Sequence, residues 1–191
     1  VGSYVVLGSV QLDNTLIRGL SEFQEDVGTA YPAISAVKKG RLPEAPMEVA
    51  LPEDVLGYLR FSGELGDTIS LSLSKALRHG VLTQSHDFTA AFTLVGITES
   101  NYLNYAAGVV NGIVGSGTAE DLLPEEYFYY NVDVRVADKG TFQATMDDLA
   151  AELNVHELDT TYNIPYLDAL GIRYRAEAAD VTGASGEGFP L

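Results

Sequence analysis

The sequence predicts an α+β protein in which a β-rich lobe is inserted into a discontinuous α/β lobe. Three observations lead to this prediction. In the middle of the chain, residues 69–74 alternate between apolar and hydroxyl side chains, which is typical of a half-buried strand. On either side, apolar residues recur at helical spacing in residues 12–27 and 142–153. Prolines from residue 43 to residue 52 mark the passage into the middle region, because proline favours extended and turning chain.

The first forty residues are predicted to form a strand, a helix and a second strand. Residues Tyr4 to Val10 make a nearly continuous apolar run rich in β-branched side chains, as in a buried strand. An amphipathic helix is predicted over residues 12–27, with Asp13 as its N-cap. Residues Tyr31 to Val37 are predicted to form the second strand, and Pro32 indicates that this strand either lies at the edge of a sheet or begins at the proline.

The middle region is predicted to be mostly β-structure. A short strand at Glu48–Leu51 leads into two helical turns at Pro52–Leu59, since proline is tolerated in a first helical turn. The alternating strand at residues 69–74 follows. A polar hairpin connection at Arg78–Asp87 then leads to a second strand at Phe88–Ile97.

Residues 100–117 have no sustained period and are predicted to be irregular, with a short strand at Ile113–Val114. Thr118 and Asp121 have the spacing of a capping box and predict a brief helix. This helix closes the middle region.

The last part of the chain returns to alternating strands and helices. A long strand is predicted at Tyr127–Ala137, because valines alternate with polar residues there. The apolar stripe of residues 142–153 predicts an amphipathic helix that ends near Asn154. A strand at residues 156–162 and a short capped helix at Asn163–Leu170 follow.

These elements predict the domain boundaries. The α/β lobe consists of two strand–helix units, residues 1–39 and 127–175, and the inserted β-rich lobe spans residues 40–126. Residues 176–191 are rich in Ala, Gly, Ser and acidic side chains without an apolar period, and we expect a flexible tail.

The composition argues against nucleic acid as a partner and excludes chemistry that depends on cysteine. The formal net charge of −16 would repel a phosphate backbone, so we expect no nucleic acid. Cysteine is absent, which excludes disulfides, thiolate zinc sites and a cysteine nucleophile.

The middle region also carries a family resemblance. The order and spacing of Gly40-Arg41-Leu42-Pro43, Glu48 to Leu51, Gly66 to Leu71 and Phe92 to Ile97 resemble the extracytoplasmic domain of FtsX-like ABC transporter permeases, the MacB-type periplasmic core domain. The resemblance covers roughly residues 1 to 174. The structural family motif comprises Gly40, Arg41, Pro43, Glu48, Gly66, Asp67 and Gly96. We expect these residues to be architectural, and Arg41 and Glu48 to pair across a turn.

The resemblance implies a function. The domain would lie between two membrane helices on the extracytoplasmic face of the cell membrane, and would be coupled mechanically through those helices to a cytoplasmic ATPase. It would be non-catalytic, would use no cofactor, and would bind an extracytoplasmic peptide or protein ligand. The family implies peptides, lipoproteins or toxins as substrates, or the regulation of cell-wall hydrolases, and the full transporter would be a dimer. A free-standing secreted or cell-surface binding domain is the alternative.

Sequence motifs typical of enzymes occur in this chain only singly, without the companion motifs that would support them. Ser72 and Lys75 have the S-x-x-K spacing of serine acyl enzymes, but they fall in a strand and no companion motif follows. Gly115-Ser116-Gly117 lacks the further glycine of a dinucleotide loop. The acidic pairs Glu125-Glu126 and Asp147-Asp148 are predicted to be solvated. No catalytic residue is therefore predicted.

Histidines and tyrosines give the remaining candidates. His79 and His86 could meet across a hairpin and bind a metal, but His156 is remote in sequence and no further ligands are evident, so no metal site is predicted. Tyr102 and Tyr105 lie in a glycine-containing loop and are the predicted binding residues, because tyrosine offers rigid contact area with a polar group. The run Tyr127–Tyr130 is predicted to be mainly structural.

Overall fold

In the computed structural model, the chain divides into two compact units, residues 1–134 and residues 135–191. The structure describes residues 2–12, 15–79, 82–100, 109–155, 160 and 162–172.

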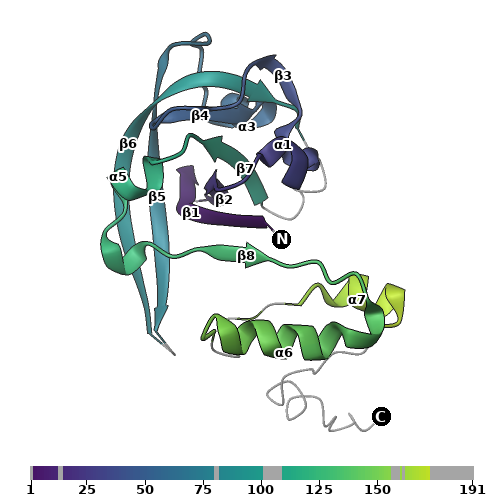
Figure 1. Cartoon of the computed structure of the whole chain (residues 1–191). Coiled ribbons are helices and arrows are strands. Elements are labelled where there is room, and N and C mark those ends of the chain that lie inside the picture. The colour runs from purple at the N-terminus through teal and green to yellow at the C-terminus, as the bar shows by residue number, and fades with distance from the viewer. Residues whose placement is uncertain are drawn as a thin grey trace, which may run out of the picture. The chain divides into compact units, whose positions relative to one another are not determined.

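Six strands of the first unit close into a mixed β-barrel (Figure 1). They are β1 (Gly2–Leu12), β2 (Thr15–Phe23), β4 (Glu48–Pro52), β5 (Thr68–His79), β6 (Leu82–Thr98) and β7 (Val109–Val114). The order around the barrel is β1, β2, β7, β4, β6, β5 and back to β1. The pairs β2–β7 and β4–β6 are parallel, and the other neighbours are antiparallel. Strand β3 (Val37–Gly40) attaches to β6, and β8 (Asn131–Asp133) attaches to β1.

The closed barrel shows that the predicted discontinuous α/β lobe is wrong. Residues 15–23, predicted to be helical, form β2, which pairs with β1 on one side and β7 on the other. The spacing of four residues between Leu16 and Leu20 is shared by a helix face and a strand face, so the apolar pattern did not separate the two. Gly19 has φ +103°, which is not helical, and pairing with two neighbouring strands decides the conformation.

Two further predicted strands are wrong. Residues 31–37 mostly form short helices: α1 (Val27–Ala30) precedes Tyr31, and α2 is Pro32–Ser35. The side chain of Asp26 caps α1 by accepting a hydrogen bond from the Gly28 N–H at 3.1 Å, a local interaction that competes with strand formation. The long strand at residues 127–137 is reduced to β8, which follows the 3-10 helix η1 (Glu125–Tyr127).

Other local predictions are confirmed. Strand β4 and helix α3 (Glu53–Tyr58) form as expected, and β5 and β6 make the predicted hairpin. The alternation in β5 is also confirmed, because Ile69, Leu71 and Leu73 are buried while Ser70 and Ser72 are exposed. The hairpin connection is shorter than predicted, since the two strands continue as far as His79 and Leu82.

The helix predicted after residue 117 exists as α5 (Thr118–Leu122), but its capping box does not form. The Thr118 hydroxyl donates to the Gly115 carbonyl at 2.6 Å and accepts from the Met47 N–H at 2.9 Å. The hydroxyl therefore joins the start of the helix to the loop before β4 instead of capping its own helix.

The core of the first unit fills the barrel. Apolar side chains from β1, β4, β5 and β6 form one cluster, together with residues of α3 and α5. Removal of this apolar surface from water is the main force that favours barrel closure. The largest side chains with less than 2% exposure are Phe92, Leu7, Leu20, Leu51, Leu71, Leu73 and Leu94.

The second unit contains η2 (Lys139–Thr141), α6 (Phe142–Glu152) and α7 (Ile164–Leu170). Both predicted helices are confirmed. Asn163 caps α7 by accepting a hydrogen bond from the Tyr166 N–H at 3.3 Å, and Gly171 ends the helix in the left-handed conformation, φ +66°. The strand predicted at residues 156–162 falls mostly outside the described residues, and the tail 176–191 falls entirely outside them.

No helix in the described parts of the chain has the length and apolar character needed to cross a membrane.

Candidate functional site

The family-motif residues meet where the connection between β3 and β4 crosses β6. Gly40 pairs with Gly96, and the Arg41 N–H donates to the Val95 carbonyl at 3.0 Å. A Cβ atom on Gly40, which has φ +75°, would lie 2.2 Å from the Val95 carbonyl oxygen. A Cβ atom on Gly96 would lie 2.1 Å from the Arg41 carbonyl oxygen. The two backbones therefore approach so closely that only glycine fits at either position.

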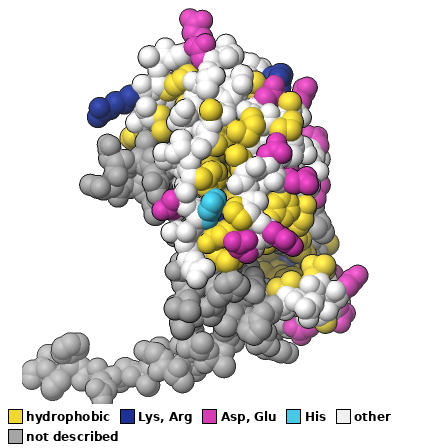
Figure 2. Space-filling model, turned by 90° about the vertical axis from the view of Figure 1, so that its left-hand side faces the viewer, with side chains coloured by type: hydrophobic (Ala, Val, Ile, Leu, Met, Phe, Trp, Pro, Cys, Tyr) yellow, Lys and Arg dark blue, Asp and Glu magenta, His cyan; other side chains and the backbone are white. Residues whose placement is uncertain are grey.

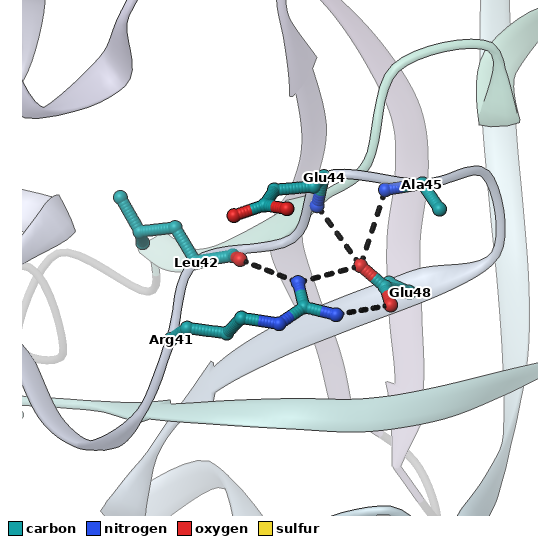
Figure 3. Close-up of polar contacts among 5 residues, drawn as sticks. All are labelled: Arg41, Leu42, Glu44, Ala45 and Glu48. Atoms are coloured by element: carbon teal, nitrogen blue, oxygen red, sulfur yellow. Dashed lines mark hydrogen bonds and ion pairs between the residues drawn. The ribbon is translucent and has the colours of Figure 1, made fainter.

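The loop that follows is fixed by an ion pair between Arg41 and Glu48, as predicted (Figure 3). The two guanidinium nitrogens donate to the two carboxylate oxygens of Glu48, at 2.8 and 2.5 Å. One of these oxygens also accepts from the N–H groups of Glu44 and Ala45, at 2.9 and 3.1 Å. We call these four residues the Arg41–Glu48 clasp. The hydrogen bonds, chiefly that from Arg41, lower the pKa of Glu48 to about 2.

The Gly66–Asp67 turn fastens the start of β5 to the same strand, β6. The Gly66 N–H donates to the Leu94 carbonyl at 2.7 Å, and the Leu94 N–H donates to the Asp67 carbonyl at 3.0 Å. The Asp67 carboxylate accepts from the Glu64 N–H at 2.8 Å, and Gly66 has φ +96°. The hydrogen bonds of Gly66 and Asp67 thus fix the backbone conformation at this turn.

A hollow of about 270 Å³ lies beside the clasp, at the end of the parallel pair β2–β7. We call it the Leu42 hollow. Its lining comes from the end of β2, the start of α1, the clasp loop and the end of β7. The lining residues are Phe23, Glu25, Asp26, Val27, Leu42, Pro43, Glu44, Ile113, Val114 and Ser116.

The charged side chains of the Leu42 hollow are all acidic. Glu25 accepts from the N–H and the hydroxyl of Ser3, both at 2.8 Å, and these bonds lower the pKa of Glu25. Asp26 is the cap of α1 and also accepts from the Thr29 hydroxyl at 2.7 Å. The exposed Glu44 contributes its N–H to the clasp. The hollow therefore combines an apolar lining with a negative rim.

A second cluster lies where η1 packs against the β5–β6 hairpin. The ring of Tyr127 lies 5.3 Å from that of His86, and the Lys75 Nζ lies 3.9 Å from the centre of the Tyr129 ring. Tyr127 is buried, whereas Tyr129 and Tyr130 are 41% and 53% exposed. Figure 2 shows a face of the molecule on which hydrophobic side chains gather, with acidic side chains around them.

Lys75 is a buried cation in this cluster, with 2% of its surface exposed. Its ammonium group donates to the Val6 carbonyl at 2.6 Å, and neither of the two ion pairs between described residues includes it. Burial lowers the pKa of Lys75 to about 8.

The S-x-x-K residues point to opposite faces of β5. Lys75 shares the buried face with Leu73, whereas Ser72 is exposed and lies 3.2 Å from the Thr89 hydroxyl. Residues three apart on a strand face opposite ways, so Lys75 is not placed to deprotonate Ser72.

In the Gly115–Gly117 turn both glycine amides already have acceptors, since the Gly115 N–H donates to the Glu48 carbonyl at 3.1 Å. The buried carboxylate of Glu22 accepts from the N–H groups of Gly117 and Ala119, at 2.9 and 2.7 Å. Glu22 thereby satisfies donors at the start of α5 that an anion would otherwise need.

The other sequence candidates have these positions. His86 stacks on Phe88, with ring centroids 5.1 Å apart. Glu125 and Glu126 are exposed on η1, and the Gln143 side chain donates to Asp147 at 2.8 Å. Within the described portion of the chain, no three His, Cys, Asp or Glu side chains are grouped to hold a metal.

Some candidates fall outside the described part of the structure. They are Tyr102, Tyr105, His156 and the side chain of His79. The binding role of the two tyrosines stays a prediction.

The sequence reasoning missed Glu22 and considered Lys75 only for its S-x-x-K spacing, although the burial of both carries a signal. Lys75 continues the inward series Ile69, Leu71, Leu73 at a spacing of two, and Glu22 stands two residues after the buried Leu20. A charge in register with a buried face predicts a buried, partnered polar group. Glu25 and Asp26 of the hollow carry no comparable signal.

Comparison with known proteins gives no match: no family model matches the chain, and no curated protein does.

Glu48→Ala is expected to lower the free energy of unfolding by about 2–3 kcal/mol, because the guanidinium and two amides lose a charged acceptor. The matched control is Glu53→Ala, which removes the exposed Lys38–Glu53 ion pair and should cost clearly less, because water screens an exposed pair. Urea unfolding followed by circular dichroism measures both, and equal losses would contradict the role of the clasp.

The loss of stability in Glu48→Ala should also depend on pH. Because the pKa of Glu48 is lower in the folded chain than in the unfolded one, the difference in free energy of unfolding between the wild type and Glu48→Ala should shrink as pH falls from 4.5 towards about 2.

Lys75→Met is expected to remove a pH dependence of stability. Between pH of about 8 and 10.5 the unfolded chain keeps the Lys75 proton that the folded chain has released, so the free energy of unfolding rises with pH. Relative to the methionine variant, the wild type should gain up to about 3 kcal/mol across this window. Urea unfolding of both proteins at several pH values measures the difference in their free energies of unfolding. The contributions of the other titrating groups are shared by the two proteins and cancel in this difference. Parallel pH profiles of the two proteins would refute the assignment.

Proposed function

We propose that this chain is the extracytoplasmic domain of an FtsX-like ABC transporter permease. In this proposal it is a non-catalytic domain that binds a ligand or partner protein and is coupled mechanically to a cytoplasmic ATPase. The observation that carries the proposal is the antiparallel pairing of β1 with β8, in which Gly2 lies opposite Asp133.

This pairing places the two connections of the barrel side by side. In an antiparallel pair the start of one strand adjoins the end of the other, so the chain enters β1 and leaves β8 on the same side, about 5 Å apart. In a domain inserted between two membrane helices the chain enters and leaves on one side. The pairing supports such an arrangement for the barrel, from which the chain continues into residues 135–191. The hydroxyl of Tyr31, a residue between α1 and α2, donates to the Asp133 carboxylate at 3.0 Å and further anchors β8.

The motif geometry also supports the proposal. The residues on which the family resemblance rests lie at close backbone crossings, turns and the clasp, where residue identity is dictated by backbone geometry and hydrogen bonding. Residues of this kind are characteristic of a fold, not of an active site. They offer no acid, base or nucleophile arranged for catalysis, and in the proposal the function resides in binding and movement.

Cysteine labelling in intact cells tests the proposal, and the absence of native cysteine from this chain gives a clean background. Ser62→Cys introduces an exposed thiol, and Ala90→Cys, at 6% exposure, is a buried control. Both are placed in the complete product of the encoding gene, with any other cysteine replaced. A membrane-impermeant maleimide should label Ser62→Cys in intact cells and spare Ala90→Cys.

Two results would overturn the proposal. One is labelling of Ser62→Cys only after the cells are permeabilised. The other is a gene product without an apolar stretch of about 20 residues on each side of this domain. Labelling in intact cells without two such stretches would instead favour the free-standing secreted or cell-surface binding domain.

A further inference from the structure

We infer that the Leu42 hollow is a binding site for an extended peptide segment in which a basic side chain stands beside an apolar one. This inference names a ligand class for the proposed binding domain and rests on the proposed function only for its biological setting. Binding itself would be a property of this chain.

The walls of the Leu42 hollow are apolar and held in place. Ile113 and Val114 are each 3% exposed and belong to β7, whose pairing with β2 fixes them relative to Phe23. Leu42 and Pro43 belong to the loop that the Arg41–Glu48 clasp holds at both ends. A preformed apolar wall can accept an apolar side chain without the cost of first ordering the site.

The size of the hollow limits the occupant. Its volume of about 270 Å³ lies just below the range of roughly 300–1,000 Å³ that is typical of sites for drug-sized ligands. It therefore suits one or two side chains of a longer molecule. Because the hollow lies at strand ends on the surface, the rest of an extended peptide can continue beyond it.

The rim determines the charge of the occupant. Glu25, Asp26 and Glu44 are exposed and line the hollow, and no lysine or arginine is among the described residues of its lining. Nearby Arg41 has both terminal nitrogens engaged by Glu48, and it attracts the Glu44 carboxylate only at longer range, without a direct contact. Figure 3 shows no contact from the Glu44 carboxylate to the other residues drawn.

The rim carboxylates also keep capacity for a ligand. Each carboxylate has about four acceptor positions. Glu25 receives two hydrogen bonds from Ser3, and Asp26 receives one from Gly28 and one from Thr29. Lysine or arginine donors can therefore be accepted without breaking these contacts, whereas an acidic side chain would meet only like charge.

Peptide titration of the full 191-residue chain tests the inference. The probe is N-acetylated leucyl-arginyl-leucinamide, and the matched probes carry glutamine or glutamate in place of arginine. Amide chemical shifts in a ¹⁵N-labelled sample report both affinity and location. The arginine peptide should shift the amides of Val27, Leu42 and Ile113, should bind more weakly at higher salt, and should bind more tightly than either matched peptide.

Paired variants sharpen the test. Asp26→Asn combined with Glu44→Gln removes two rim charges, while asparagine keeps the α1 cap and glutamine leaves the clasp N–H in place. This variant should weaken binding of the arginine peptide roughly three- to tenfold. The control, Glu126→Gln, removes one exposed charge that does not line the hollow and should leave the affinity unchanged.

The outcome of the titration decides whether the Leu42 hollow is the proposed binding site. Equal binding of the three peptides, shifts confined to other residues, or no binding at millimolar concentration would overturn the inference. Failure of the titration would leave the membrane assignment standing, because that assignment is tested by labelling in cells. Conversely, labelling of Ser62→Cys only after the cells are permeabilised would overturn the permease proposal, but a positive titration would still support the binding site.

Discussion

The close crossing of the β3–β4 connection over β6 is the constraint on which the rest of the first unit depends. At Gly40 and Gly96 each backbone occupies the space that a side chain on the other would need. The crossing lets one strand, β6, pair with β4 on one side and, on the other side, with β5 and then with β3. Without this approach, β4 could not reach its parallel position and the barrel would lack a neighbour for β7.

The Arg41–Glu48 clasp follows from this crossing and extends its effect. The crossing delivers Arg41 to the start of the loop, and Glu48 opens β4 at its end. Their ion pair, with the amides of Glu44 and Ala45, gives an exposed loop a defined shape. That shape places Leu42 and Glu44 on the Leu42 hollow, so a structural motif and a candidate binding surface share one loop.

Local interactions were predictable from the sequence, and long-range closure was not. The alternation in β5, the capped helix α7 and the Arg41–Glu48 pair each depend on residues near one another in the chain, and all three are confirmed. Strand β2 was missed because its apolar spacing suits two conformations and because one of its two partners, β7, lies far along the chain. The Leu42 hollow is assembled from residues 23–27, 42–44 and 113–116, so no single stretch signals it.

The most direct test of this account compares two glycine-to-alanine variants by urea unfolding. At Gly96 the added methyl would meet backbone at 2.1 Å, whereas at Gly57 in α3 it would meet nothing within 4 Å. The account predicts that Gly96→Ala loses about 3 kcal/mol or more of stability. Gly57→Ala should be neutral or gain up to about 1 kcal/mol. A Gly96→Ala variant as stable as the wild type would contradict the central role of the crossing.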